Sequence, residues 1–179
     1  DSVLVAKPGR RELGDLPGKL DASRLNVILA PSEDVEFVTM LVSKLKPLAA
    51  KYKIRLVGME SWYSMPSVDL NDLEVLDHTY AAPAFFDQED PRIRAFASAF
   101  QERTQTAVDE YALLGFDITF YYLKALYTQG LTFPEHFDQV HTEPLHMGFR
   151  MSRTGAENGF RNEYAIMLEQ EDLRLIKVQ

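Results

Sequence analysis

Residues 26–58 constrain the fold more than any other stretch of the chain. An apolar run rich in β-branched residues occupies positions 26–30, and a second apolar run occupies positions 54–58. Short runs of this kind are typical of buried strands. Between them, residues 34–52 carry apolar side chains at spacings of three and four, which predicts an amphipathic helix. Because a strand, a helix and a strand in this order form a βαβ unit, we predict two parallel strands joined by a right-handed crossover.

The helix predicted over residues 34–52 has a start signal and one interruption. Ser32 lies in the preceding turn and can cap the helix, while Glu33 and Asp34 place negative charge in its first turn. Pro47 lies inside the helical pattern, where a proline removes a backbone hydrogen bond and costs about 3 kcal/mol. We therefore expect a helix that is kinked at Pro47 or split in two there.

The remaining chain continues as helices and strands, which predicts an α/β protein. The expected elements are a short helical turn at residues 71–76, a strand at 79–86 limited by Pro83, a helix starting at Asp90-Pro91, a helix over 110–129 ended by Gly130, a short strand at 146–151, and a β-hairpin of residues 163–168 and 173–178.

These elements suggest four successive parts of the chain. Residues 1–25 form a leading segment, and residues 26–80 form a βαβ lobe. Residues 81–145 form the helical part of a second lobe. Residues 146–179 supply C-terminal strands and a hairpin that return to a hinge or to the first lobe. The chain of 179 residues is long enough for one domain or two small lobes.

Composition excludes several classes of function. The formal net charge is −8, so a polyanion such as a nucleic acid would be repelled at long range, and we predict no nucleic-acid partner. The sequence contains no cysteine, which excludes disulfides, thiolate catalysis and cysteine metal sites. No stretch is long and apolar enough to predict a transmembrane helix. The chain starts at Asp1 without a methionine, which is the pattern expected of a mature fragment.

Sequence motifs for catalysis and cofactor binding are missing. Neither GxGxxG nor GxxxxGK[ST] occurs, and GxSxG and HExxH are also absent. His136, His141 and His146 recur every five residues with acidic residues between them, a spacing that puts them on different faces of a helix. A loop could still gather these histidines around a divalent metal, and solvated loop histidines are the alternative. We predict no catalytic residue, no metal and no cofactor.

Four residues are candidates for ligand binding because of where they follow the predicted strands. Ser32 and Glu33 come after the first strand, and Trp62 and Tyr63 come after the second. In open parallel sheets, ligands collect beyond the carboxyl ends of the strands. Ser32 could instead be only a helix cap, and the aromatic pair could instead pack in the core.

Several segments resemble type I periplasmic binding proteins of the branched-chain amino-acid receptor kind. Residues 26–32, the helix that follows, residues 54–58 and Trp62 resemble one of the family's repeated βαβ units. Residues 111–117 (Tyr-Ala-Leu-Leu-Gly-Phe-Asp) are similar to the family's Tyr-Ala-x-x-Gly-Tyr-Asp segment, with Phe116 in place of the usual tyrosine. The opening repeats of the family's first lobe have no counterpart, so the resemblance is to a C-terminal portion only.

The resemblance implies three-layer, parallel-sheet lobes joined by a hinge and closed by a C-terminal hairpin. It implies a non-catalytic, periplasmic or other extracytoplasmic protein that binds an amino acid, peptide or cell-wall fragment for a membrane transporter. Ser32 and Glu33 would then be the residues to test against a ligand, and Asp117 would be structural. An envelope interaction or assembly module that reuses the receptor fold, as a homodimer, is the alternative. A metal-dependent hydrolase using residues 136–146 is a further alternative.

Overall fold

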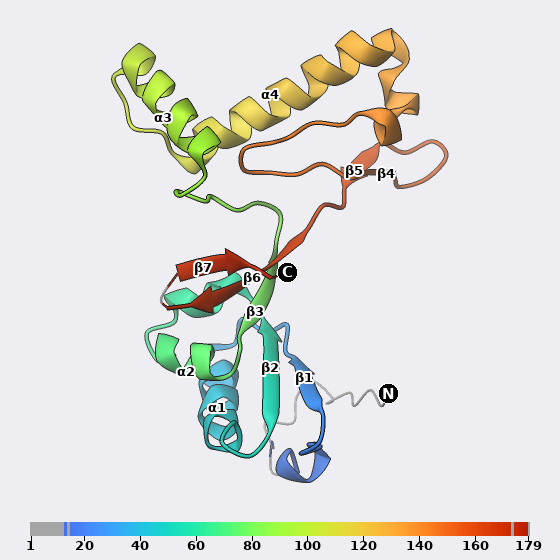
Figure 1. Cartoon of the computed structure of the whole chain (residues 1–179). Coiled ribbons are helices and arrows are strands. Elements are labelled where there is room, and N and C mark those ends of the chain that lie inside the picture. The colour runs from blue at the N-terminus through green and yellow to red at the C-terminus, as the bar shows by residue number, and fades with distance from the viewer. Residues whose placement is uncertain (1–12, 14, 173, 179) are drawn as a thin grey trace. The chain divides into compact units, whose positions relative to one another are not determined.

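The structure is a computed structural model that describes residues 13, 15–172 and 174–178. Its helices and strands follow one another along the chain as drawn in Figure 1. In order they are β1 (Leu25–Leu29), α1 (Val35–Leu45), β2 (Lys53–Gly58), α2 (Leu70–Val75), β3 (Thr79–Ala82), α3 (Pro91–Thr104), α4 (Glu110–Gln129), β4 (Met151–Arg153), β5 (Phe160–Asn162), β6 (Ile166–Glu171) and β7 (Arg174–Lys177). Within the described residues, short 3-10 turns lie at Pro17–Lys19, Lys46–Leu48, Glu60–Ser64, Gly130–Glu135 and Phe137–Gln139.

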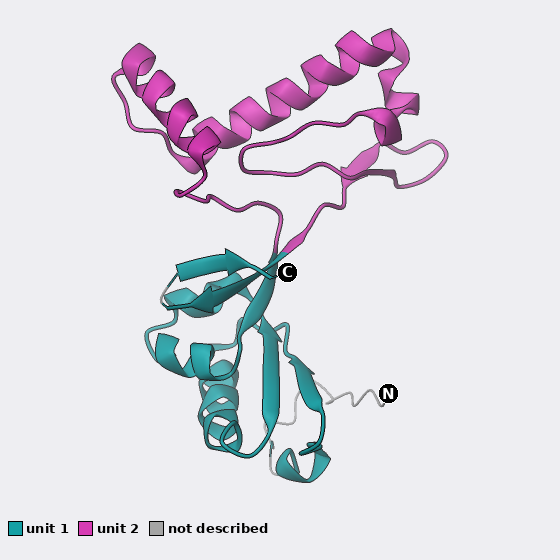
Figure 2. Cartoon of the chain, in the orientation of Figure 1, with its two compact units in different colours: residues 1–81, 167–179 teal, residues 82–166 magenta. Residues whose placement is uncertain are grey.

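The chain forms two compact units (Figure 2). Unit 1 contains residues 1–81 and 167–179, and unit 2 contains residues 82–166. The chain therefore passes between the units twice, at 81/82 near the end of β3 and at 166/167 near the start of β6. The sequence predicts boundaries between its parts after residues 80 and 145, whereas the two units divide at 81/82 and 166/167.

Unit 1 is built on a mixed five-stranded sheet in the order β1-β2-β3-β6-β7. β1 and β2 are parallel, with Leu25 opposite Lys53 and Leu29 opposite Val57. β3 continues the parallel part, while β6 and β7 pair antiparallel. The predicted parallel βαβ unit, the α/β class and the C-terminal hairpin are thus confirmed. The sheet is mixed, because the hairpin strands β6 and β7 join the parallel strands in one sheet.

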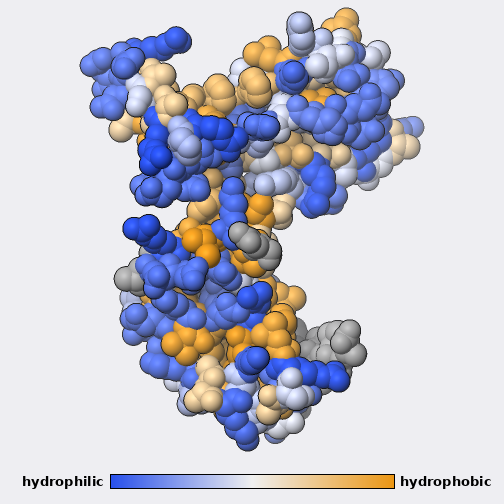
Figure 3. Space-filling model, in the orientation of Figure 1, coloured by the Kyte–Doolittle hydropathy of each residue, from blue (hydrophilic) through white to orange (hydrophobic). Residues whose placement is uncertain are grey.

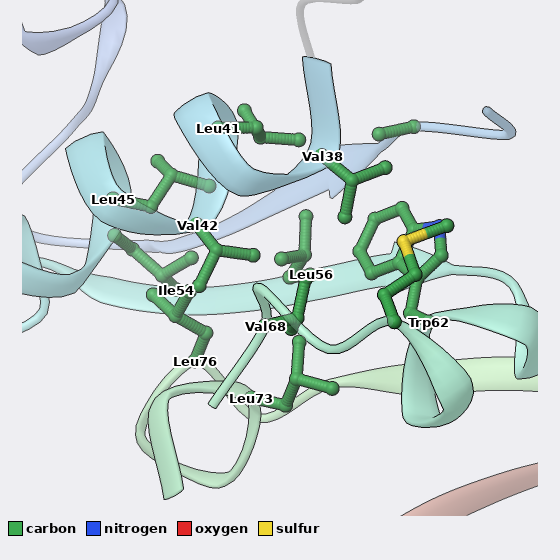
Figure 4. Packing of buried hydrophobic residues seen from close by; sticks show 12 residues of the cluster. Val38, Leu41, Val42, Leu45, Ile54, Leu56, Trp62, Val68, Leu73 and Leu76 are labelled. Carbon is green, nitrogen blue, oxygen red and sulfur yellow. The ribbon is translucent and has the colours of Figure 1, made fainter. Parts of the chain in front are cut away.

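An aliphatic cluster holds the helices of unit 1 on one face of this sheet (Figure 4). Val38, Leu41, Val42 and Leu45 of α1 point towards Ile54 and Leu56 of β2, and Leu73 and Leu76 lie on the same side. These α1 positions repeat at spacings of three and four, so one stripe of the helix is apolar and is buried. Burial of such a stripe is the main source of helix stability in a folded protein.

The other face of the sheet is open at β1. Leu25, Val27 and Leu29 alternate along the strand with more buried neighbours and are 52%, 61% and 70% exposed. Among the described residues, no layer covers this side of β1. The predicted three-layer arrangement is therefore not found at this edge of the sheet.

Unit 2 has a different core, made largely of aromatic rings. Tyr121 of α4 stacks on Phe149 with ring centroids 4.1 Å apart, and Phe137 lies beside both Tyr121 and Phe160. Tyr121, Phe137 and Ala125 are buried in this cluster. A two-stranded antiparallel ribbon, β4–β5, supplies Met151 and Phe160 to its edge. Large flat side chains thus fill a core that few residues contribute to.

Helix ends follow the local sequence closely. Asp90 caps α3 by accepting a hydrogen bond from the backbone N–H of Arg92, with Pro91 in the first turn, as predicted. α4 has the predicted bounds and ends at Gly130, whose φ of 63° a glycine adopts without strain. Pro47 ends α1 early, because the chain continues past Leu45 only as a 3-10 turn.

The structure differs from several local predictions. The strand expected at 79–86 is shorter and ends at Ala82, because Pro83, which cannot donate a ladder hydrogen bond, terminates it as one of its two expected effects. The strand expected at 146–151 starts only at Met151, although Met147 forms a single bridge to Ala84. β5 was not expected at all. Some predictions fall outside the described residues. These are Leu173 in the predicted hairpin and residues 1–12 and 14 of the predicted leading segment.

No helix in the described part of the chain has the length and apolar character needed to cross a membrane.

Candidate ligand site

The candidate site lies where β1 and β2 end. Since these strands are parallel neighbours, the turns that follow them leave the same edge of the sheet. Ser32 and Glu33 occupy the first turn, and Trp62 and Tyr63 occupy the 3-10 turn Glu60–Ser64 after β2. The predicted grouping of these four residues from two separate turns therefore has a structural basis in the strand register.

A hydrogen bond joins the two turns. The indole Nε1–H of Trp62 donates to the backbone carbonyl of Ser32 at 2.7 Å. A buried indole N–H needs such a partner, because leaving it unpaired costs about 1–3 kcal/mol. Ser32 and Trp62 are thus in direct contact although 30 positions separate them in the sequence.

Ser32 does not cap α1 as predicted. Its hydroxyl oxygen accepts a hydrogen bond from the N–H of Asp34 at 3.2 Å. Asp34 is the N-cap residue, since its carboxylate accepts from the N–H of Phe37 at 3.0 Å. The correction has a simple cause: α1 begins at Val35, so a capping side chain must come from position 34.

The aromatic pair divides between the core and the surface. Trp62 is fully buried and belongs to the aliphatic cluster of unit 1. The structure therefore decides for the core-packing alternative at Trp62, and stacking on a ligand would require this ring to be uncovered. Tyr63 is half-buried, Ser32 is half-buried and Glu33 is exposed. A ligand contact of these four residues stays a prediction.

Sequence reasoning missed two residues that contact the candidate site residues. His78 and Tyr80 complete an aromatic cluster, which we define as Trp62, Tyr63, His78 and Tyr80. The imidazole of His78 stacks on Trp62 with centroids 4.8 Å apart, and its Nδ1 lies 3.0 Å from the hydroxyl oxygen of Tyr63. Tyr63 also lies 5.6 Å from Tyr80 between ring centroids.

Strand register and a glycine explain why this cluster forms. β3 starts beside the end of β2, with Val57 opposite Thr79 and Gly58 opposite Tyr80. A side chain at Gly58 would collide with the cluster, because a Cβ there would lie 2.5 Å from the Trp62 ring and 2.6 Å from His78 Nε2. A glycine at the end of an apolar strand was the one sequence signal of this close approach.

Burial keeps the aromatic cluster uncharged. It lowers the pKa of His78 to about 4 and raises the pKa of Tyr80 to about 12. The pKa of Tyr63 is raised as well, first by burial and then by Tyr80 and the charge on Glu169. A neutral imidazole with so low a pKa is a weak base near neutral pH. The cluster is thus a neutral, buried group of rings beside the two turns.

The three histidines considered for a metal site do not come together. His136 lies in a turn with its Nδ1 3.4 Å from the side-chain amide of Gln139, and His141 is exposed. His146 is half-buried, and burial lowers its pKa although Asp117 acts in the opposite direction. Within the described residues, no group of three or more histidine, aspartate or glutamate side chains is arranged to hold a metal ion.

Asp117 has a structural part in unit 2, as the resemblance implied. Its buried carboxylate accepts three hydrogen bonds of 2.8 Å from the backbone N–H groups of Leu145, His146 and Met147. These bonds compensate a charge that would otherwise be costly to bury. Asp117 thereby fastens the 145–147 segment to α4.

Unit 1 also has a hollow away from these turns. A shallow apolar hollow of about 240 Å³ is lined by Leu13, Leu16, Pro17, Lys44 and Leu48. None of the predicted site residues borders it. We therefore base the candidate site on the turns after β1 and β2 and not on this hollow, which has only one polar side chain to orient a ligand.

Comparison with known proteins does not establish a family for this chain. No family model matches the chain, and no curated protein matches it. Two solved structures that match are of an ABC transporter substrate-binding protein from Desulfitobacterium hafniense, one of them in complex with Leu. Their sequences are 13% and 14% identical to this chain, with TM-scores of 0.40 and 0.39. Each match covers 82% of this chain and 49% of the chain in the solved structure. The chain thus spans about half of their length, and TM-scores this low do not establish a common fold.

Proposed function

We propose that this chain is part of an extracytoplasmic solute-binding protein and that the turns after β1 and β2 form one side of its ligand site. The observation that carries the proposal is the hydrogen bond from Trp62 to the carbonyl of Ser32, which fixes one turn against the other. Pre-organised turns of this kind lower the entropy cost of binding. Their position at the carboxyl ends of parallel strands is the usual one for ligands in α/β sheets.

Each residue of the site would have a distinct part in binding. Glu33 is the exposed charge next to the turn, so it would attract a cationic group such as the amino group of an amino acid or peptide. Ser32 and Tyr63 would supply hydroxyl groups to the ligand. Trp62 would hold the two turns together through its hydrogen bond to the carbonyl of Ser32. The neutral aromatic cluster provides no acid–base pair, which favours a binding protein over an enzyme.

The type I receptor architecture is the finer part of the proposal. Its support is the resemblance of residues 26–62 and 111–117 and the division of the chain into two units, with connecting segments that could act as a hinge. Such a protein would deliver an amino acid, peptide or cell-wall fragment to a membrane transporter. One of the two matching structures is a complex with Leu, so leucine is the first ligand to try.

Thermal shift with the 179-residue chain tests the proposal. We expect leucine, another amino acid, a short peptide or a cell-wall fragment to raise the melting temperature by about 2–4 °C at saturating concentration. Glu33→Gln should weaken the affinity for the active compound about tenfold, because a charge-assisted hydrogen bond is lost. Glu102→Gln, an exposed carboxylate in α3, is the matched control and should leave affinity unchanged. The proposal would be contradicted if none of these compounds raised the melting temperature, or if Glu33→Gln and Glu102→Gln bound the active compound with equal affinity.

One observation favours the alternative of an interaction module. Several large apolar side chains of α4 and β1 are exposed, which is the usual mark of a surface that contacts another protein. The two functions are compatible, since they concern different elements. No finding supports the hydrolase alternative.

A further inference from the structure

α4 is apolar on nearly every side. Among its 20 residues only Glu110, Asp117 and Lys124 are charged, and Asp117 is buried. The side that faces unit 2 is a single stripe of residues four apart, namely Leu113, Asp117, Tyr121 and Ala125. A helix that is hydrophobic all round is normally covered all round, so unit 2 accounts for only part of the surface of α4.

A second stripe on α4 is exposed, and we call it the outer stripe. It consists of Phe116, Phe120, Leu123 and Tyr127, which are 39%, 43%, 60% and 87% exposed. Positions separated by four, three and four residues lie on one face of a helix. At 1.5 Å per residue, this stripe is about 16 Å long. Figure 3 shows hydrophobic residues along the part of the surface that Figure 1 labels α4.

We propose that the outer stripe binds the outer stripe of a second copy of this chain, with the two α4 helices antiparallel about a twofold axis. In a twofold interface, each residue that contacts a partner position must itself be contacted in return. The spacing of four, three and four is the same read in either direction. Phe116 therefore meets Tyr127 of the second copy, and Phe120 meets Leu123.

The amount of apolar surface suits a dimer. With about 200 Å² of surface on each large residue, the exposed fractions leave roughly 500 Å² uncovered per copy. Pairing would bury roughly 1,000 Å² in total, which reaches the lower limit for a specific interface. Phe96 of α3 lies beside Phe116 with ring centroids 4.8 Å apart and adds an aromatic edge to one end of the stripe.

The charges on α4 also permit self-association. No member of the outer stripe is charged, although the whole chain carries a net charge of −8. In the antiparallel register Lys124 lies opposite Thr119 of the second copy, so the two lysines do not face each other. Like charges directly opposed would cost energy, and this arrangement avoids them.

Sedimentation analysis of charge variants tests the surface. We expect the wild-type chain to form dimers at protein concentrations up to about 200 µM. Leu123→Glu should raise the dissociation constant of the dimer at least about 100-fold. Tyr127→Glu, at a position that is 87% exposed, should act in the same way without affecting the fold. Tyr111→Glu is the matched control, because Tyr111 is 72% exposed on a different side of α4. Circular dichroism melts check that each variant is folded.

Cysteine pairs test the antiparallel geometry, and the chain has no cysteine of its own to interfere. A mixture of Phe116→Cys and Tyr127→Cys chains should form a mixed disulfide, because these positions meet across the axis. Either variant alone should not, since its two cysteines would lie about 16 Å apart. A wild-type chain that stays monomeric, a dimer insensitive to both glutamate variants, or ready disulfides in Phe116→Cys alone would overturn the proposal.

Discussion

α1 of unit 1 and α4 of unit 2 bury their apolar residues to very different degrees. In α1 the large apolar side chains lie mainly on one stripe, which the aliphatic cluster covers. In α4 the stripe at Leu113, Asp117, Tyr121 and Ala125 is buried, yet many larger side chains remain exposed. Unit 1 thus buries most of the apolar surface of α1 by itself, whereas unit 2 leaves much of the apolar surface of α4 exposed and available to a partner.

The two cores also differ in what holds them. Unit 1 is held by close packing of aliphatic side chains from α1, β2 and α2. Unit 2 relies on stacked aromatic rings and on a buried carboxylate that receives three backbone hydrogen bonds. Packing tolerates small losses in many places, while a buried charge depends on every one of its partners. The two units should therefore respond differently to mutation.

Leu56→Ala should have the largest effect and should be confined to unit 1. Leu56 is fully buried in the aliphatic cluster, so we expect a loss of about 3–4 kcal/mol in the free energy of unfolding. Trp62 is the only tryptophan and lies in the same cluster, so its fluorescence in urea reports on unit 1. Val27→Ala, at a position 61% exposed on β1, should cost less than about 1 kcal/mol. Equal losses would refute the assignment of the core.

Asp117→Asn should destabilise unit 2 by about 2–3 kcal/mol. An amide in place of the carboxylate brings N–H donors towards the N–H groups of residues 145–147 and leaves at least one unpaired. Hydrogen exchange of these amides should become at least about tenfold faster. Asp138→Asn, in an exposed turn, is the control and should leave exchange unchanged. If the Trp62 transition moves as much as unit 2 does, the units do not unfold independently.

Acid should weaken unit 1 through His78. The pKa of this group is about 4 in the folded chain and near its ordinary value of 6.5 in the unfolded chain. Between these values the unfolded chain binds more protons, so stability falls as pH is lowered from about 6.5 to 4. The slope should be at most about 1.4 kcal/mol per pH unit. Urea titrations by Trp62 fluorescence should show a shallower slope in His78→Gln, and an identical slope would remove His78 as the cause.

Arg55→Met should have the smallest effect, on the attachment of the C-terminal hairpin. Arg55 of β2 lies 2.7 Å from a carboxylate oxygen of Asp77 and 3.8 Å from one of Glu169 in β6. Because the pairs are partly exposed, we expect a loss of about 1 kcal/mol or less that shrinks at high salt. Arg24→Met, which breaks a more exposed pair with Asp21, should cost less still. A loss independent of salt would indicate packing and not charge.

Local sequence determined much of this protein. The periodicity of 34–52 and 110–129, the Asp90-Pro91 start, an interruption at Pro47 and the closing hairpin could all be predicted from the sequence. Each depends on neighbours a few residues away, because helix periodicity, caps and turns are local. The grouping of residues 32–33 with 62–63 could be predicted too, because parallel strands end at the same edge.

Tertiary structure decided the rest. Which residue caps α1 depended on where the helix starts, and the burial of Trp62 depended on its packing in the aliphatic cluster and against His78. His78 and Tyr80 joined the aromatic cluster with Trp62 and Tyr63 only through the register of β3 against β2. The sequence also did not reveal which side of α4 is exposed, because composition and periodicity show which residues are apolar but not which of them a neighbour covers. Contacts between residues far apart in the chain depend on how whole elements pack, and a single sequence does not state that packing.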